Sequence, residues 1–147
     1  MKIVTSTPSK FKLGAWLIRI YQKTTFSHVA IISDNLVFQA SHGMVNCTHI
    51  DVFNQNNTIL DTFNVNPEIL DMEYVYKQLG KPYSYFQVLR IALKFLTGIK
   101  ISRENGDSQF ICSEFVGKAL KLDWVNDSTT PKEIAIYLKK HNNSNNI

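Results

Sequence analysis

The sequence predicts an α+β fold in which a small antiparallel sheet packs against helices. Short β-rich runs dominate the first half of the chain, whereas apolar residues at helical three-and-four spacing dominate after Pro67. The 147 residues are 44% hydrophobic and 19% charged, which is typical of one globular domain. We therefore expect a single domain over residues 1–141 and a disordered, Asn-rich tail over residues 142–147.

The first half is expected to supply the sheet. An N-terminal strand leads into a helix whose apolar residues share one face. Two mostly buried strands flank a polar turn at residues 33–35, and this pattern predicts a hairpin. Two more β-rich runs, separated by a polar loop at residues 54–57, can extend the sheet. The expected strands are Lys2–Ser6, His28–Ile32, Leu36–Ala40, Met44–Ile50 and Thr58–Val65, and the expected helix is Lys12–Gln22.

The second half is expected to be helical. Gly80 and Pro82 stop the first helix, and a loop over residues 98–109 precedes the third. Thr130 and Pro131 form a typical helix start for the last one. The expected helices are Ile69–Leu79, Tyr83–Leu96, Cys112–Leu120 and one from Thr130 to the tail. Cys112 is thereby placed at a helix N-terminus.

Charge and hydropathy exclude several classes of protein. The formal net charge of +4 comes from basic residues spread along the chain, so we expect no nucleic-acid partner. The most apolar stretch, Tyr85–Ile99, contains three polar residues and falls short of the ~20 apolar residues of a spanning helix, so we expect no transmembrane segment. The N-terminus lacks the apolar core of a secretory signal, which predicts a cytoplasmic location.

Cofactor chemistry has no visible motif in the sequence. There is no dinucleotide fingerprint, no phosphate-binding glycine loop and no common zinc spacing of Cys and His, so we expect neither a cofactor nor a metal. The only thiols are Cys47 and Cys112, which suits a reducing compartment.

Three residues could together perform nucleophilic catalysis. A helix N-terminus stabilises a thiolate, so Cys112 is the candidate nucleophile. His28 is the candidate general base, because a nearby imidazole can accept the thiol proton and later protonate the leaving group. Gln39, on the neighbouring strand about level with His28, can orient the imidazole ring without carrying charge.

Other polar residues have weaker cases. His42 could replace Gln39 as the third residue if the strand register differs. Cys47 and His49 alternate along one expected strand and so share a face, but two ligands without a third favour a structural role. For Glu114 we expect a surface or loop contact, and for His141 an exposed, unstructured position beside the tail.

Four segments resemble those of the circularly permuted NlpC-type papain-like enzymes, which are related to the lecithin:retinol acyltransferase-like branch. The segments are FSHVAI (Phe26–Ile31), VFQA (Val37–Ala40), LGKPYSY (Leu79–Tyr85) and FICSEFV (Phe110–Val116). The resemblance implies a papain-like core with Cys112 as nucleophile, His28 as base and Gln39 at the third position, where many relatives have Glu or His. Tyr83 is a candidate for the family's tyrosine near the oxyanion, and the backbone N–H of Cys112 is the more general donor.

The resemblance also implies a class of reaction. We expect a hydrolase that cleaves an amide bond of a peptide or peptidoglycan fragment through a thioester at Cys112. The alternatives are a thiol acyltransferase or lipid-ester hydrolase acting on an acyl lipid, and a binding module that keeps the fold without turnover. A bacterial or phage source fits this resemblance, which for a phage product would mean the host cytoplasm. The oligomeric state is left open.

Overall fold

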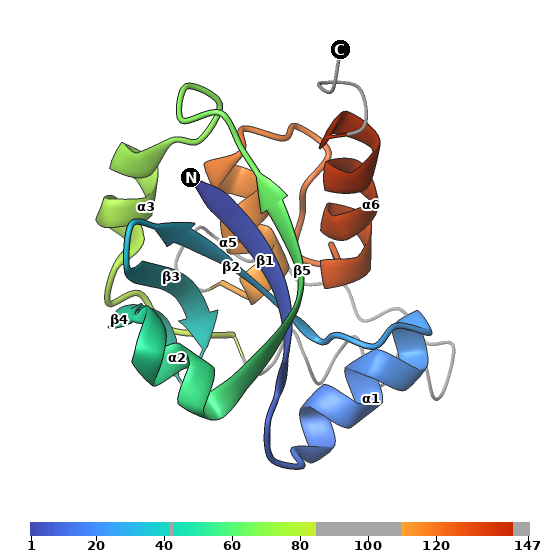
Figure 1. Ribbon diagram of the computed structural model, residues 1–147. Coiled ribbons are helices and arrows are strands. Elements are labelled where there is room, and N and C mark those ends of the chain that lie inside the picture. The colour runs from blue at the N-terminus through green and yellow to red at the C-terminus, as the bar shows by residue number, and fades with distance from the viewer. Residues whose placement is uncertain (42, 85–109, 143–147) are drawn as a thin grey trace.

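Five strands form one antiparallel sheet in the order β4-β3-β2-β1-β5 (Figure 1). The computed structural model describes residues 1–41, 43–84 and 110–142. Its strands are β1 (Lys2–Pro8), β2 (His28–Ser33), β3 (Leu36–Ser41), β4 (Met44–His49) and β5 (Asn57–Asn64), and its helices are α1 (Leu13–Gln22), α2 (Ile50–Asn56), α3 (Met72–Gln78), α5 (Cys112–Ala119) and α6 (Pro131–Asn142). The expected α+β class, the hairpin and the antiparallel sheet are confirmed.

The sheet is covered on both faces, which explains why its central strands are apolar along their whole length. Ile3 and Ile31 belong to the larger core cluster, which the sheet shares with α3, α5 and α6. Val4 and Ile32, one residue further along each strand, belong to a second cluster with Phe53 of α2. Successive side chains point to opposite faces of a strand, so a single apolar run serves two cores. Helix α5 packs across β2 and β3 (Figure 1).

Helix α2 corrects the sequence interpretation, which extended a strand to Ile50 and placed a polar loop at residues 54–57. His49 caps the helix, because its Nδ1 accepts a hydrogen bond from the Asp51 N–H at 3.3 Å. Phe53 is the single buried residue of the helix and anchors it to the sheet. An Asn-rich run favours turns locally, and here burial of one aromatic ring overrides that preference.

The remaining helices differ from expectation mainly at their ends. Helix α3 begins at Met72 rather than near Ile69, because Asp71 caps it by accepting a hydrogen bond from the Tyr74 N–H at 2.9 Å. The expected capping of α6 is confirmed, with Thr130 N–H donating to Glu133 Oε2 at 2.7 Å.

Several predictions concern residues beyond the described ranges. Tyr83 forms an isolated parallel bridge with Phe110 and does not start a helix. The rest of the expected helix Tyr83–Leu96 and of the loop at residues 98–109 lies outside the described residues. Helix α6 ends at Asn142, and residues 143–147 of the expected tail are likewise outside them.

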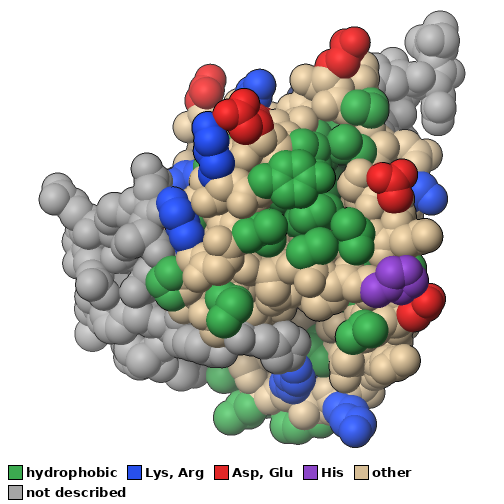
Figure 2. All heavy atoms as spheres, turned by 90° about the vertical axis from the view of Figure 1, so that its left-hand side faces the viewer, with side chains coloured by type: hydrophobic (Ala, Val, Ile, Leu, Met, Phe, Trp, Pro, Cys, Tyr) green, Lys and Arg blue, Asp and Glu red, His purple; other side chains and the backbone are tan. Residues whose placement is uncertain are grey.

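The surface around α2 and α3 includes an apolar area. Figure 2 shows hydrophobic side chains gathered near the centre of this face, with Lys, Arg, Asp and Glu side chains around them. Exposed large hydrophobic residues on the elements of this side are Leu36, Met44, Val52, Tyr76 and Leu79. Among the described helices, none is long and apolar enough to cross a membrane.

Gly117 of α5 gives a test of this packing. A Cβ atom at Gly117 would lie within 3.1 Å of Ile134 Cδ1 and within 2.9 Å of Val125 Cγ1, closer than such atoms normally approach. We expect Gly117→Ala to lower the free energy of unfolding by about 1–3 kcal/mol, because overpacking outweighs the better helix propensity of Ala. Urea denaturation measures this difference.

The control is Gly14→Ala in α1. No heavy atom lies within 4 Å of a Cβ built at Gly14. This variant should match or exceed the stability of the wild type by up to about 1 kcal/mol. Equal effects of the two substitutions would contradict the packing described for α5.

Candidate active site

Cys112 is the first residue of α5, as the sequence predicts. The N-cap residue Ile111 has an extended backbone and supplies no side-chain hydrogen bond to the helix. The N–H groups of the first helical turn have no partner within a helix, so they are available to other acceptors. Because the Ile111 side chain cannot accept a hydrogen bond, the positive end of the α5 helix dipole is available to groups next to Cys112.

The thiol of Cys112 is buried, with 5% of the residue exposed. Burial raises the pKa of this thiol to about 11, although backbone N–H groups of Val29, Ser113 and Cys112 itself act in the opposite direction by hydrogen bonding to the sulfur. At neutral pH Cys112 is consequently a protonated thiol. The lowered pKa that a helix N-terminus alone predicts is overridden by desolvation.

The sulfur of Cys112 lies at the point where β2 and β3 stop pairing. Their described ladder comprises Ser33↔Leu36, Ile32↔Val37 and Ile31↔Phe38, and it goes no further. Val29 lies beyond the last pair, and its N–H group hydrogen-bonds to the Cys112 thiol. The N-terminus of α5 thus contacts β2 at the residue next to His28.

His28 and Gln39 are brought together at the same place. His28 Nε2 lies 2.9 Å from Gln39 Oε1. An amide oxygen only accepts, so Nε2 carries the proton and Nδ1 is the nitrogen with the lone pair in the neutral ring. Nδ1 is therefore the atom that can act as a base.

The register refines the expectation that the two side chains are level. Continuing the β2–β3 ladder would place Gln39 opposite Ala30 rather than opposite His28. The two side chains meet diagonally across strands whose pairing has ended. The predicted pair is present, but the predicted register was wrong by two residues.

A cavity of about 330 Å³ lies next to this pair. His28, Gln39 and Tyr83 line one part of it, and Ala15 and Ile18 of α1 line another. Cys112 is not among the described residues that line it. A ligand in this cavity would therefore meet the His28 side before it reaches the buried thiol.

Tyr83 is tied to Phe110, which lies just before α5. Its N–H donates to the Gly43 carbonyl at 2.8 Å, and the neighbouring Phe110 N–H donates to the Pro82 carbonyl at 3.1 Å. Tyr83 thus lines the His28 cavity and also pairs with Phe110, which precedes Cys112 by two residues. Tyr83 therefore remains a candidate hydrogen-bond donor to an oxyanion.

Ser6 is a neighbour of His28 that the sequence interpretation missed. It is the direct cross-strand partner of His28 on β1, at a bulge between Thr5 and Ser6. Its side chain is fully buried, and its Oγ has no hydrogen-bond partner among the described residues. Only the strand register reveals this position, since nothing in the sequence around Ser6 differs from an ordinary strand.

The other polar candidates take structural roles or cannot be placed. His49 caps α2, Cys47 is an exposed free thiol, and no group of three potential metal ligands occurs among the described residues. His42 lies outside the described residues. His141 is exposed but belongs to α6, with Nδ1 2.8 Å from the Tyr137 carbonyl, so the expectation of an unstructured residue was wrong.

Glu114 also departs from expectation, because it is buried and not on the surface. Its Oε1 lies 3.2 Å from Lys118 Nζ, one helical turn later on α5. Carboxylates are almost never buried without a partner, and this ion pair supplies one. The pair stabilises α5, and neither residue is among the described residues that line the His28 cavity.

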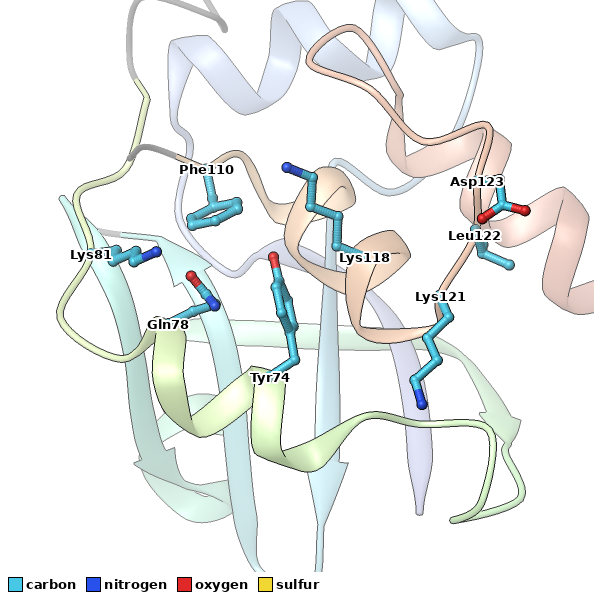
Figure 3. Close-up of a pocket in the computed structure, with 8 residues that line it drawn as sticks. All are labelled: Tyr74, Gln78, Lys81, Phe110, Lys118, Lys121, Leu122 and Asp123. Carbon is cyan, nitrogen blue, oxygen red and sulfur yellow. The ribbon is translucent and has the colours of Figure 1, made fainter. Parts of the chain in front are cut away.

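A second cavity, of about 390 Å³, lies between α3 and α5 (Figure 3). Lys81 and Lys118 approach the buried Phe110 ring, with Nζ atoms 5.6 Å and 5.4 Å from its centroid. Figure 3 shows the Tyr74 hydroxyl directed between them and Lys121 directed away. None of the predicted catalytic residues lines this cavity.

No model of a known protein family matches the chain, and no curated protein matches it either.

The raised pKa of Cys112 predicts a pH dependence of stability. Burial favours the protonated thiol in the folded protein, so the stabilisation is complete below the ordinary value of about 9 and is lost as the pH rises toward 11. In a Cys47→Ser background we expect the free energy of unfolding to fall by about 1.4 kcal/mol more between pH 7 and pH 10 than in Cys112→Ala. Identical pH profiles for the two proteins would show that the thiol is not desolvated.

The His28–Gln39 hydrogen bond predicts one imidazole tautomer. Nitrogen-15 NMR of the neutral ring should show Nε2 protonated and Nδ1 unprotonated. Gln39→Met keeps the length of the side chain but removes the acceptor, so it should produce a mixture of tautomers. Gln55→Met, at an exposed position of α2, is the matched control and should change nothing. A proton on Nδ1 in the wild type would contradict the arrangement.

Proposed function

We propose that this protein is a cysteine-dependent hydrolase that cleaves an amide bond through a thioester intermediate. Cys112 is the nucleophile, His28 the general base and Gln39 the residue that orients the imidazole. The observation that carries the proposal is the His28 Nε2 to Gln39 Oε1 hydrogen bond, which leaves Nδ1 as the basic nitrogen. The contact of Cys112 with the Val29 N–H supports it, because that contact brings the helix N-terminus to the residue beside His28.

The first half-reaction forms the thioester. The Cys112 proton passes to His28 Nδ1 as the sulfur bonds to the carbonyl carbon of the substrate. The carbonyl oxygen becomes an oxyanion, for which N–H groups at the start of α5 are the donors, with Tyr83 as a further candidate. The amide C–N bond then breaks as the proton moves from His28 to the departing nitrogen.

The second half-reaction restores the enzyme. Water attacks the thioester carbon and gives a proton to His28 Nδ1. The C–S bond breaks, the carboxylic acid leaves, and the sulfur recovers its proton from His28. No redox step or metal ion takes part.

Burial of Cys112 sets a condition on this mechanism. Because burial holds the pKa of the thiol at about 11, the resting enzyme does not hold a preformed thiolate. Proton transfer to His28 has to accompany attack on the substrate, and the orientation of the imidazole ring then limits the rate. Gln39 contributes through this orientation.

The substrate class in this proposal follows from the resemblance to permuted NlpC-type enzymes. A peptide or a peptidoglycan fragment is the first candidate, and the α+β fold is then of the papain-like, permuted type. A reducing, cytoplasmic location belongs to the same proposal and is supported by two cysteines that form no disulfide.

Two other functions use the same fold. A binding module without turnover is favoured by one observation, the burial of the protonated Cys112. A thiol acyltransferase or lipid-ester hydrolase would use the same thioester and is favoured by the apolar α1 residues Ala15 and Ile18 in the wall of the cavity. The reactivity of Cys112 distinguishes the binding module from the amide hydrolase and from the acyltransferase, because only the two enzymes need a reactive thiol.

Thiol reactivity tests the proposed pair of Cys112 and His28. In a Cys47→Ser background we expect His28→Ala to slow alkylation of Cys112 by iodoacetamide at pH 7 at least tenfold, because the base that removes the proton is lost. Gln39→Ala should slow it less, about three- to tenfold. Mass spectrometry after incubation with an activated ester should show an acyl group on Cys112 that His28→Ala does not acquire.

The second thiol provides the control for this experiment. In Cys112→Ser, the exposed Cys47 should react at the same rate with and without His28. If Cys112 also reacts independently of His28 and Gln39 and takes up no acyl group, the binding-module function replaces the hydrolase.

A further inference from the structure

Helix α1 presents a stripe of large apolar side chains to the outside of the protein. Leu13, Trp16 and Ile20 are 61%, 41% and 46% exposed, and Phe11, just before the helix, is 74% exposed. Within the helix, Leu13, Trp16 and Ile20 follow three-and-four spacing and lie on one face. Gln22 is the only buried residue of α1, although the helix is largely apolar in composition.

The opposite side of α1 attaches it to the fold. Gln22 Oε1 accepts a hydrogen bond from the Lys132 N–H at 3.1 Å, and Arg19 Nη1 donates to Thr7 Oγ1 at 3.2 Å. Ala15 and Ile18 line the cavity that contains His28. The hydrogen bonds of Gln22 and Arg19 thus fix the orientation of α1, with the apolar stripe directed outward. Figure 1 shows α1 at the periphery of the molecule, beyond the end of β1.

Charge indicates what this stripe contacts. Residues 1–33 contain five basic side chains and no acidic one, although the whole chain has 12 acidic residues. Lys10 and Lys23 are exposed at the two ends of α1 and form no ion pair within the described part of the chain. Exposed Trp, Phe and Leu side chains flanked by lysines are the composition of helices that lie in the interface of an anionic bilayer.

We propose that α1 docks the protein on the surface of an anionic phospholipid bilayer. Phe11, Leu13, Trp16 and Ile20 would enter the interface, and Lys10 and Lys23 would contact the headgroups. Docking places the cavity behind α1 next to the lipid surface, because the inner face of the same helix forms part of the cavity wall. The docking does not depend on the proposed chemistry of Cys112.

Vesicle sedimentation of the full chain tests the proposal. We expect binding to vesicles of phosphatidylcholine and phosphatidylglycerol in equal amounts, weaker binding to phosphatidylcholine alone, and a decrease at 0.5 M NaCl. Leu13→Ser/Ile20→Ser should reduce binding at least tenfold. The matched control is Leu60→Ser/Ile136→Ser, two residues outside α1 that are 42% and 56% exposed, and it should bind like the wild type.

The lysines and the tryptophan give two independent readouts. Lys10→Gln/Lys23→Gln should weaken binding to the anionic vesicles several-fold, whereas Lys2→Gln/Lys140→Gln should not. Trp16 and Trp124 are the only tryptophans. In Trp124→Phe the fluorescence of Trp16 should shift to the blue with anionic vesicles, and in Trp16→Phe the fluorescence of Trp124 should stay unchanged.

Three outcomes would overturn the proposal. They are the absence of binding to anionic vesicles, an equal loss of binding in both serine double variants, and a concentration-dependent dimer without vesicle binding that Leu13→Ser/Ile20→Ser dissociates. The last outcome would assign the stripe to a second copy of the chain. Cys112→Ala should bind vesicles like the wild type, so failure of the hydrolase proposal is distinguishable from failure of the docking proposal.

Discussion

The contact between the N-terminus of α5 and the end of the β2–β3 ladder is the constraint on which the candidate site depends. The β2–β3 ladder stops at Ile31↔Phe38, while β2 stays paired with β1 as far as Ser6↔His28. Beyond the end of the β2–β3 ladder, the Val29 N–H hydrogen-bonds to the Cys112 sulfur. Where the strands are no longer paired, the side chains of His28 and Gln39 meet, and thus one interruption of the sheet positions all three residues.

Two effects act on Cys112 in opposite directions. The helix N-terminus favours the thiolate by about 0.3–1 kcal/mol in exposed settings. Burial disfavours it, and the resulting pKa of about 11 shows that burial is the larger effect here. In the proposed mechanism, the protonated thiol of the resting protein does not react by itself. Its chemistry would depend on proton transfer to His28 at the moment of attack rather than on a permanent ion pair.

Helix α1 connects the cavity with the outside of the molecule. Its inner residues Ala15 and Ile18 line the cavity beside His28, and its outer residues Leu13 and Trp16 form an exposed apolar stripe. A globular protein normally buries the apolar side of such a helix. In this chain the side that carries Ala15, Ile18 and Gln22 faces the protein, and Gln22 anchors it by accepting a hydrogen bond from the Lys132 N–H, so both faces of α1 are available for function.

The sequence by itself determined the α+β class, the hairpin and the start of α5, because alternation, helical spacing and capping residues act over a few neighbouring positions. It missed α2, where burial of Phe53 overrides an Asn-rich turn signal, and it misjudged the register of Gln39. Only the tertiary structure decided that Cys112 is buried and that α1 is exposed. Burial and pKa depend on atoms from segments far apart in the chain, and no local pattern contains that information.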